Sequence, residues 1–442
     1  MRCLTVPRRG GLPQGGTVVL EGKNSVAKTI SEKILSAHSG KDASAGDLVV
    51  AELDFVMAQD GTAPLAIRAF EGMGGDSIAM AGRAALCIDH SAPSPLRAIS
   101  ELHALMREFA DKYGLELNDV GEGVCHQVML DKGHALPGSL VIGADSHTCT
   151  YGAVNAFATG VGSTDLAAGL LSGSLWFRVP ETMKVTIDGK LSRGVFAKDI
   201  ALMMVGDITA DGATYMALEV GGAAMVDLGL DGRLTISNLA VEMGAKAGLM
   251  EADQKTLAFF DGRTTEKLVP VSPDAGAAYQ EEREYDISGL GPQVAKPHTV
   301  DNVAPVEEVE GIPIAEGLIG TCTNGRLEDL RAAAEILRGK KVAHGVRLIV
   351  APASREVMMQ ALREGLIEVF TECGGSVMCP GCASCVGTHQ GIPGDGENVI
   401  STANRNFKGR MGNPEAFIYL ASPATVAASC VAGEITDPRR VM

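Results

Sequence analysis

The spacing of apolar and polar residues predicts alternating helices and strands in the first part of the chain. Apolar residues recur at helical spacing in residues 26–37 and 94–113. Strand-like apolar runs occupy residues 48–58 and 139–144. Glycine and alanine dominate residues 152–173, which favours a closely packed helix beside a loop. We therefore expect a first α/β unit here.

The pattern changes after residue 180. Residues 183–192 alternate between apolar and polar, as a half-exposed strand does, and a helix is expected near residues 238–248. The stretch 274–306 is polar and contains several prolines, so it is the best candidate for a linker. A second α/β unit is expected between these two boundaries.

The last part of the chain has the clearest alternation. A strand, a helix, a second strand and a second helix are expected at residues 311–322, 326–339, 346–353 and 354–365. A strand–helix–strand order of this kind predicts a parallel sheet, because the crossover helix returns the chain to the same end.

Together these patterns predict an α/β fold with three α/β domains. We expect the domains at residues 24–182, 183–298 and 299–442, after an N-terminal tail of residues 1–23. The length of 442 residues fits two or three domains, each large enough to bury a core. The first twenty residues contain three arginines and no acid, and a loose tail is the favoured interpretation over a targeting segment.

Composition and charge narrow the function. The formal net charge is −16, which argues against a nucleic-acid partner because phosphate binding needs clustered lysine and arginine. No apolar run reaches the ~18 residues of a transmembrane helix, so no membrane partner is expected. The N-terminus has no apolar core of signal-peptide length, and we expect a cytoplasmic protein.

The cysteines point to metal or redox chemistry. Ten cysteines are too few for a disulfide scaffold of this length, yet four lie close together in TECGGSVMCPGCASC. Cys382 and Cys385 form a C-x-x-C pair, and Cys322 follows a predicted strand. Three thiolates would leave one coordination position open, as catalytic metal sites do. Spacing leaves an iron–sulfur cluster, zinc, a redox dithiol and plain buried thiols open, and Cys379 competes as a ligand.

Acidic residues adjoin histidines at three points. Asp145, Ser146 and His147 follow the predicted strand at 139–144, where an acid and a hydroxyl can orient an imidazole. The same residues could equally cap the next helix. Asp89 precedes His90, and Glu122 lies four residues before His126.

A glycine-containing loop, STANRNFKGRMG, carries Arg405 and Arg410. Arginine forks bind carboxylates in a bidentate manner, so the pair favours an anionic ligand in this otherwise acidic chain. The alternative is an ordinary solvated basic loop.

The motifs DSHT, GTCTNG, PGCASCVG and NRNFKGR, in this order, resemble the aconitase superfamily, and within it the large subunits of the isopropylmalate dehydratase type. The resemblance runs from about residue 24 to the C-terminus. It implies three α/β domains around one 4Fe–4S cluster. The implied cluster ligands are Cys322, Cys382 and Cys385, with Cys379 a neighbour only.

The resemblance also implies roles for individual residues. The implied catalytic residues are Asp89, His90, Asp145, His147 and Glu242. The implied substrate-binding residues are Gln59, His126, Ser146, Arg405 and Arg410. The cluster neighbours are Asn238 and Asn404. Gln59 departs from the pattern of the small-substrate branch, which often has histidine at this position.

The family's catalytic serine lies on a fourth, swivelling domain, and no Ser-Arg base motif follows NRNFKGR in this sequence. The resemblance therefore implies that a separate small subunit supplies the base, in a heterodimer or heterotetramer. The implied reaction is the interconversion of 3-isopropylmalate and 2-isopropylmalate in leucine biosynthesis. Citramalate, 2,3-dimethylmalate, maleate or citraconate, and homoaconitate are alternative substrates.

Two other functional classes compete with this hydro-lyase. The C-x-x-C-x-x-C run from Cys379 to Cys385 would suit a non-catalytic zinc or electron-transfer protein. An RNA-binding relative is the third hypothesis, and the net charge opposes it.

Overall fold

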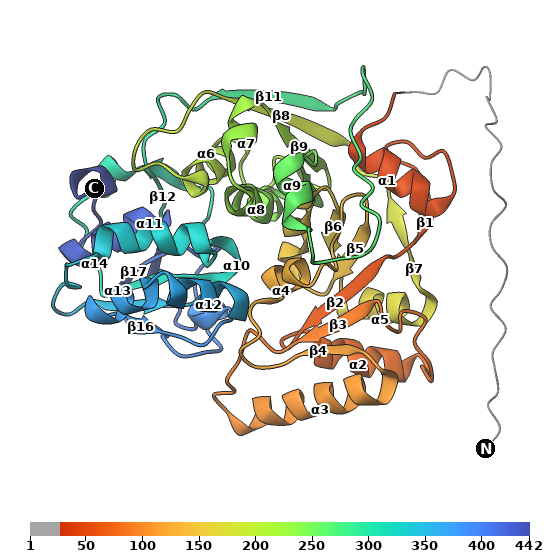
Figure 1. The fold of residues 1–442 in the computed structure, drawn as a ribbon, viewed down its shortest axis with the longest axis horizontal. Helices are drawn as coiled ribbons and strands as arrows, with labels where there is room; N and C mark the ends of the chain where they lie inside the picture. The colour runs from red at the N-terminus through yellow and green to blue at the C-terminus, as the bar shows by residue number, and fades with distance from the viewer. Residues whose placement is uncertain (1–26) are drawn as a thin grey trace.

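The computed structural model describes residues 27–442, which form four β-sheets with helices packed between and around them (Figure 1). The expected tail of residues 1–23 lies outside the described residues. The first sheet is fully parallel and has five strands. In spatial order they are β4 (Glu116–Asn118), β3 (Ala84–Cys87), β2 (Phe55–Gln59), β5 (Leu140–Gly143) and β6 (Phe157–Gly160).

Helices and a two-stranded antiparallel ribbon accompany this first sheet. The helices are α1 (Ile30–Ser39), α2 (Ala63–Gly72), α3 (Arg97–Tyr113), α4 (Cys125–Asp131), α5 (Ser163–Ser172) and the 3₁₀ helix η1 (Ser146–Val154). The ribbon pairs β1 (Leu48–Glu52) with β7 (Ser174–Arg178). The apolar run at 48–58 is thus two strands, because the chain leaves the ribbon at Leu53 and Asp54 and then enters the sheet.

The second sheet is also parallel and lies at the top of Figure 1. Its strands, in spatial order, are β10 (Ala247–Leu249), β9 (Ala217–Gly221), β8 (Thr182–Asp188) and β11 (Glu281–Asp286). Its helices are α6 (Ala197–Ile208), α7 (Ala223–Asp227), α8 (Leu230–Asn238), η2 (Leu239–Met243) and α9 (Gln254–Phe259). The helix expected at 238–248 is wrong: this segment is the end of α8, one 3₁₀ turn and a short strand, with Gly244 at φ +84° ending the turn.

The third sheet has seven strands and a parallel centre, as the alternation predicted. In spatial order they are β13 (Val303–Pro305), β12 (Gln293–Ala295), β18 (Phe417–Leu420), β17 (Asn398–Ser401), β14 (Glu316–Ile319), β15 (Arg347–Val350) and β16 (Ser376–Val377). The helices are α10 (Thr321–Asn324), α11 (Leu327–Leu337), α12 (Arg355–Arg363), α13 (Leu366–Glu372), α14 (Pro423–Ala432), η3 (Val306–Glu308), η4 (Ala383–Val386) and η5 (Pro438–Arg440).

The expected linker carries strands of two sheets. β11 pairs with β8 of the second sheet, whereas β12 pairs with β18 of the third. The chain therefore passes from one sheet to the next between Asp286 and Gln293. β12 has only three residues, and β11 alternates half-buried with exposed residues that are almost all charged. The composition of this stretch therefore indicates a linker.

One apolar core joins the three large sheets. Met57 of β2, Val185 of β8 and Leu318 of β14 belong to the same cluster of buried side chains. Burial of such residues is the main force that holds the three sheets against one another. Within residues 27–442 we find no helix with the length and apolar character that a bilayer crossing requires.

Candidate active site

Five of the candidate site residues lie at or just after the carboxyl ends of strands. Gln59 ends β2, and Asp89 and Asp145 follow β3 and β5 after one or two residues. In the third sheet, Cys322 follows β14 and Asn404 follows β17. All five strands are parallel members of their sheets, so these residues lie beyond the carboxyl ends, where open α/β sheets bind ligands.

The three cysteines singled out in the sequence are all buried. Cys322 lies in α10, and Cys382 and Cys385 lie at the start and within η4. Burial, together with nearby Cys385 and Asp145, raises the pKa of Cys322 to about 12. A hydrogen bond between the Cys382 and Cys385 side chains raises the pKa of Cys382 and lowers that of Cys385 well below its usual value.

Amide and guanidinium groups surround these sulfurs. The Nδ2 atoms of Asn238 and Asn404 donate to Cys322 Sγ at 3.4 and 3.3 Å. Arg410 donates from Nη2 to Cys385 Sγ at 3.4 Å, and its buried Nε has no partner among the described residues. Donors aimed at sulfur stabilise thiolates, so this chemistry suits metal-bound cysteines.

Cys379 has a different environment. It is half-buried, its Sγ bonds the Pro380 carbonyl, and its near neighbours are Gly121 and Arg355. Gly381 has φ +156°, and a Cβ there would lie 2.9 Å from the Asp89 carbonyl. Glycine therefore lets the cysteine loop rest on the first sheet, where Cys382 N–H donates to that carbonyl at 3.0 Å.

The distances between the three cysteine sulfurs can be compared with those expected around a single zinc ion. Three sulfurs bound to one zinc ion would lie about 4 Å apart, because Zn–S bonds are about 2.3 Å long. Within residues 27–442, the group of three ligand atoms all within 4.8 Å of one another is Asp60, Asp89 and His90, not a set of cysteines.

Asp145 is the centre of a buried hydrogen-bond network. Its Oδ1 lies 2.8 Å from His126 Nε2 and accepts the His147 backbone N–H at 2.8 Å. Gln59 donates to its Oδ2 at 3.3 Å. Burial alone would raise the pKa of Asp145, but His126 and His147 hold it well below its usual value. Asp145 also acts as the N-cap of η1, so the capping interpretation of the DSH motif is confirmed, and its role in a site beside the histidines stays a prediction.

His90 lies among three carboxylates. Its Nδ1 is 2.9 Å from Asp89 Oδ1, and its Nε2 is 3.7 Å from Asp145 Oδ2. Burial alone would lower the pKa of His90, but Asp89, Asp145 and Asp60 together raise it to about 10. His90 therefore carries a proton at neutral pH and can donate it.

Glu242 links two more predicted residues. Its Oε1 lies 2.8 Å from His147 Nε2 and accepts from Arg405 Nε at 2.7 Å. Burial alone would raise the pKa of Glu242, but His147 and Arg405 lower it. Ser146 Oγ lies 3.3 Å from His147 Nδ1, so the residues of the DSH motif, η2 and the arginine loop form one network.

The fold also brings in residues that the sequence interpretation missed. Asp60 accepts the backbone N–H of His90 at 2.8 Å and of Ser91 at 2.9 Å, which fixes the His90 loop. Arg326 is fully buried and donates to the Cys322 carbonyl at 2.7 Å. Lys198 donates to the Ala403 carbonyl beside Asn404 at 2.6 Å. Asp60 is next to Gln59, and Arg326 directly follows the GTCTNG motif. Their position beside recognised residues was therefore the only sequence feature that could have identified them.

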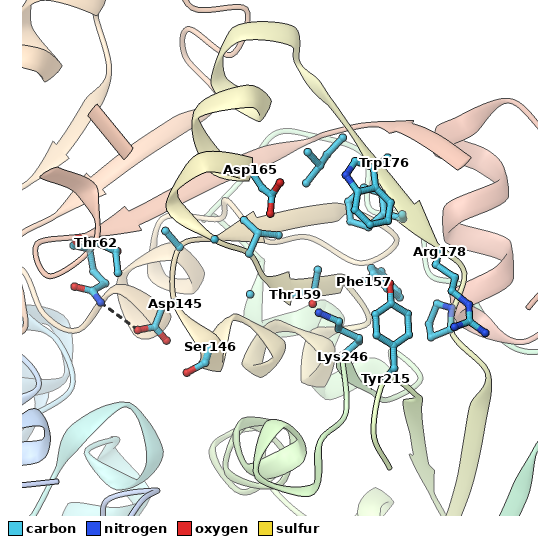
Figure 2. A pocket seen from close by; sticks show the side chains of 18 residues that line it. Thr62, Asp145, Ser146, Phe157, Thr159, Asp165, Trp176, Arg178, Tyr215 and Lys246 are labelled. Carbon is cyan, nitrogen blue, oxygen red and sulfur yellow. Dashed lines mark hydrogen bonds between the residues drawn. The ribbon is translucent and has the colours of Figure 1, made fainter. Parts of the chain in front are cut away.

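A cleft of about 520 Å³ opens from this network (Figure 2). Gln59, Asp145 and Ser146 line one end. Figure 2 shows Trp176, Arg178, Tyr215 and Lys246 gathered at the other end. The cleft therefore reaches Asp145 of the buried network, while His90, His147 and Glu242 are not among the residues that line it.

Comparison with known proteins agrees with this geometry. The model of the aconitase family (aconitate hydratase) matches residues 32–433. A protein of Archaeoglobus fulgidus named 3-isopropylmalate dehydratase large subunit 2 is 55% identical over 419 residues, covering 94% of this chain and all of that protein. One from Methanopyrus kandleri, 3-isopropylmalate dehydratase large subunit 1, is 51% identical over 94% of this chain and 99% of its own length.

Two further relatives widen the picture. A probable methanogen homoaconitase large subunit of Methanosarcina mazei is 48% identical, covering 89% of this chain and all of that protein. The solved structure of aconitase X from Thermococcus kodakaraensis has a TM-score of 0.51 at 14% identity, covering 85% of this chain and 88% of its own, which shows the fold alone. The names of the sequence relatives as large subunits imply a separate small subunit. The resemblance seen in the sequence is confirmed, and the chain belongs to the aconitase family of hydro-lyases.

Proposed function

We propose that this chain is the large subunit of a cytoplasmic hydro-lyase that interconverts 3-isopropylmalate and 2-isopropylmalate in leucine biosynthesis. The names of relatives at 55% and 51% identity support this substrate. Homoaconitate is the second candidate, because a relative at 48% identity carries that name. A separate small subunit would supply the catalytic base and complete the site.

Membership of the aconitase family implies an iron–sulfur cluster, and the donors present fit one. Cys322, Cys382 and Cys385 would hold a 4Fe–4S cluster, with Asn238 and Asn404 as its neighbours. The support is the pair of amides directed at Cys322 Sγ and the Arg410 guanidinium directed at Cys385 Sγ. When bound, the cluster would supply a Lewis acid for the substrate's hydroxyl and one carboxylate.

The chain's own residues would bind the rest of the substrate. Arg410 is held by Nη2 at Cys385 Sγ and Arg405 by Nε at Glu242, so the remaining guanidinium donors of each could bind carboxylates. Gln59 and Ser146 add neutral donors at the end of the cleft. Two carboxylate-binding groups are what a hydroxy-diacid requires.

The histidines would move the proton. His90 is protonated because Asp89 and its other carboxylate neighbours surround it, and it would give this proton to the departing hydroxyl. His126 and His147 both lie beside Asp145 Oδ1, at 2.8 and 3.6 Å, and would orient water and substrate. The observation that carries the proposal is this convergence of three buried cysteines, paired arginines and protonated His90 in one family-typical site.

The test is an anaerobic reconstitution of the full chain with and without its companion small subunit. We expect dehydration of 3-isopropylmalate by the pair and little or none by the chain alone, followed as alkene formation. A parallel panel contains homocitrate, citramalate and 2,3-dimethylmalate. Full activity of the chain alone, no activity of the pair on any diacid, or stoichiometric zinc without iron and sulfide would each overturn the proposal.

A further inference from the structure

The cleft described above extends along the open edge of β7. Four consecutive residues of this strand, from Leu175 to Arg178, all line the cleft. Consecutive side chains of a strand point to opposite faces, so a cavity that touches all four must run along the strand's edge rather than over one face. Within residues 27–442, β7 pairs with β1 only, and its other edge has no strand partner.

The pairing register shows which backbone groups are free. Leu53 N–H donates to the Gly173 carbonyl and Val179 N–H donates to the Asp47 carbonyl, at the two ends of the ribbon. Antiparallel pairs alternate between bonded and non-bonded residues, so 175 and 177 bond to β1. The N–H and C=O groups of Trp176 and Arg178 therefore point toward the cleft. An exposed edge of this kind is a template for another extended segment.

The side chains at this end define what the segment must look like. Trp176 is 59% exposed and is the only tryptophan of the chain. Arg178 and Lys246 both lie over the Tyr215 ring, at 5.7 and 5.1 Å from its centre. Two cations beside exposed aromatic rings favour a segment with both apolar and acidic side chains. Asp165 is the one acid at this part of the cleft.

We propose that the open edge of β7 binds an extended, acidic segment of the small subunit by strand addition and guides that subunit to the active site. This inference rests on the proposed function. The cleft leads from β7 to Asp145 and Ser146, where the small subunit must contribute its base. The chain's own N-terminal tail is a poorer occupant, because its first twenty residues contain three arginines and no acid, and Arg178 and Lys246 would repel it.

The variants that test this proposal distinguish backbone hydrogen bonding at β7 from contacts made by its side chains. Trp176→Pro removes an N–H that points at the cleft and leaves every bond between β7 and β1 in place. Val50→Pro is the matched control, because Val50 lies directly opposite Trp176 in the ribbon, is 60% exposed, and directs its own N–H away from the cleft. Trp176→Ala and the double variant Arg178→Glu/Lys246→Glu test side chain and charge without proline.

The measurement is the dissociation constant of the small subunit for the reconstituted full chain. We expect Trp176→Pro and the charge-reversed variant to weaken binding about tenfold or more, with Val50→Pro unchanged and iron and sulfide content normal in all. Their activity should return when the small subunit is in excess. Binding by these variants as tight as that of the unaltered chain overturns the groove proposal while the proposed function stands.

Fluorescence of Trp176 distinguishes the occupants. We expect quenching by acrylamide in the free chain and protection when the small subunit is added. Protection already present in the dilute free chain would assign the groove to the chain's own tail, and protection that grows with concentration would assign it to a second copy. Either result overturns the proposal. If the unaltered chain neither binds the small subunit nor gains activity from it, the proposed function itself fails.

Discussion

His147 and Glu242 contact each other across the junction of the first two sheets, with 2.8 Å between Nε2 and Oε1. His147 lies in η1, which follows β5, and Glu242 lies in η2, which follows α8. Gly152 permits this close approach, because a Cβ there would lie 2.0 Å from the Gly248 carbonyl oxygen. The contact therefore depends on both tertiary packing and a glycine that no other residue could replace without a shift.

Glu242→Gln should lower kcat by about 10² or more, because the imidazole of His147 and the guanidinium of Arg405 lose their shared negative partner. Iron content should remain normal, since Glu242 contacts none of the three cysteines. The assay is steady-state dehydration by the reconstituted complex. Glu251→Gln, an exposed glutamate of the same region, is the control. An unchanged kcat for Glu242→Gln would remove this residue from the acid–base network.

Cys382→Ser should abolish cluster binding, whereas Cys379→Ser should keep it. Cys382 is buried and its side chain is hydrogen-bonded to Cys385, while Cys379 is half-buried and lies toward Gly121 and Arg355. Iron and sulfide analysis with visible absorption after anaerobic reconstitution measures both variants. The reverse outcome would replace Cys382 with Cys379 in the ligand set.

Arg410→Lys should raise the Michaelis constant about tenfold or more and leave iron content largely intact. The compact ammonium of lysine cannot reproduce the planar fork with which the guanidinium bonds Cys385 Sγ and still directs further donors elsewhere. Lys408→Ala, in the same loop and exposed, should leave the Michaelis constant unchanged. Equal Michaelis constants for Arg410→Lys and the unaltered chain would exclude Arg410 from substrate binding.

Glu219 should make the free energy of unfolding fall as the pH rises from about 5 to 8. Burial, with Glu251 and Glu32 nearby, raises the pKa of Glu219 to about 7 despite bonds from Ile30 and Tyr279. The unfolded carboxyl releases its proton near its ordinary pKa of 4.5, so the folded state binds more protons between these two pKa values and loses stability with rising pH. Denaturant unfolding of Glu219→Gln across this range should give a flatter profile. Parallel profiles for the two proteins would contradict this assignment.

The regular alternation of the third sheet could be predicted because each element repeats its own period. Helix α11 and strands β14 and β15 lie within the ranges expected from apolar spacing. The segment 238–248 could not be predicted, since Leu239, Ala240 and Met243 are buried along with Ala245 and Ala247, which gives no single helical face. Burial from more than one direction erases the period on which a sequence prediction depends.

Some residues of the candidate site could be predicted from the sequence, and others could not. Motifs identified the cysteines, the DSH residues and the arginine loop, because each is a short run with its own chemistry. Asp60 and Lys198 have no such run, and their importance comes from contacts more than twenty residues away. The open edge of β7 is likewise invisible in the sequence, where Trp176 stands in an ordinary strand pattern.

The sequence by itself determined the family, the α/β class and the residues capable of binding metal and acid, since these depend on local order and residue type. Only the tertiary structure decided that His90 lies among Asp89, Asp145 and Asp60 and that Cys379 lies beside Gly121 and Arg355. Those are distances between segments far apart in the chain, fixed by packing the three sheets on one apolar core. Electrostatic effects depend on such distances, which is why the protonation of His90 could not be inferred from residue order alone.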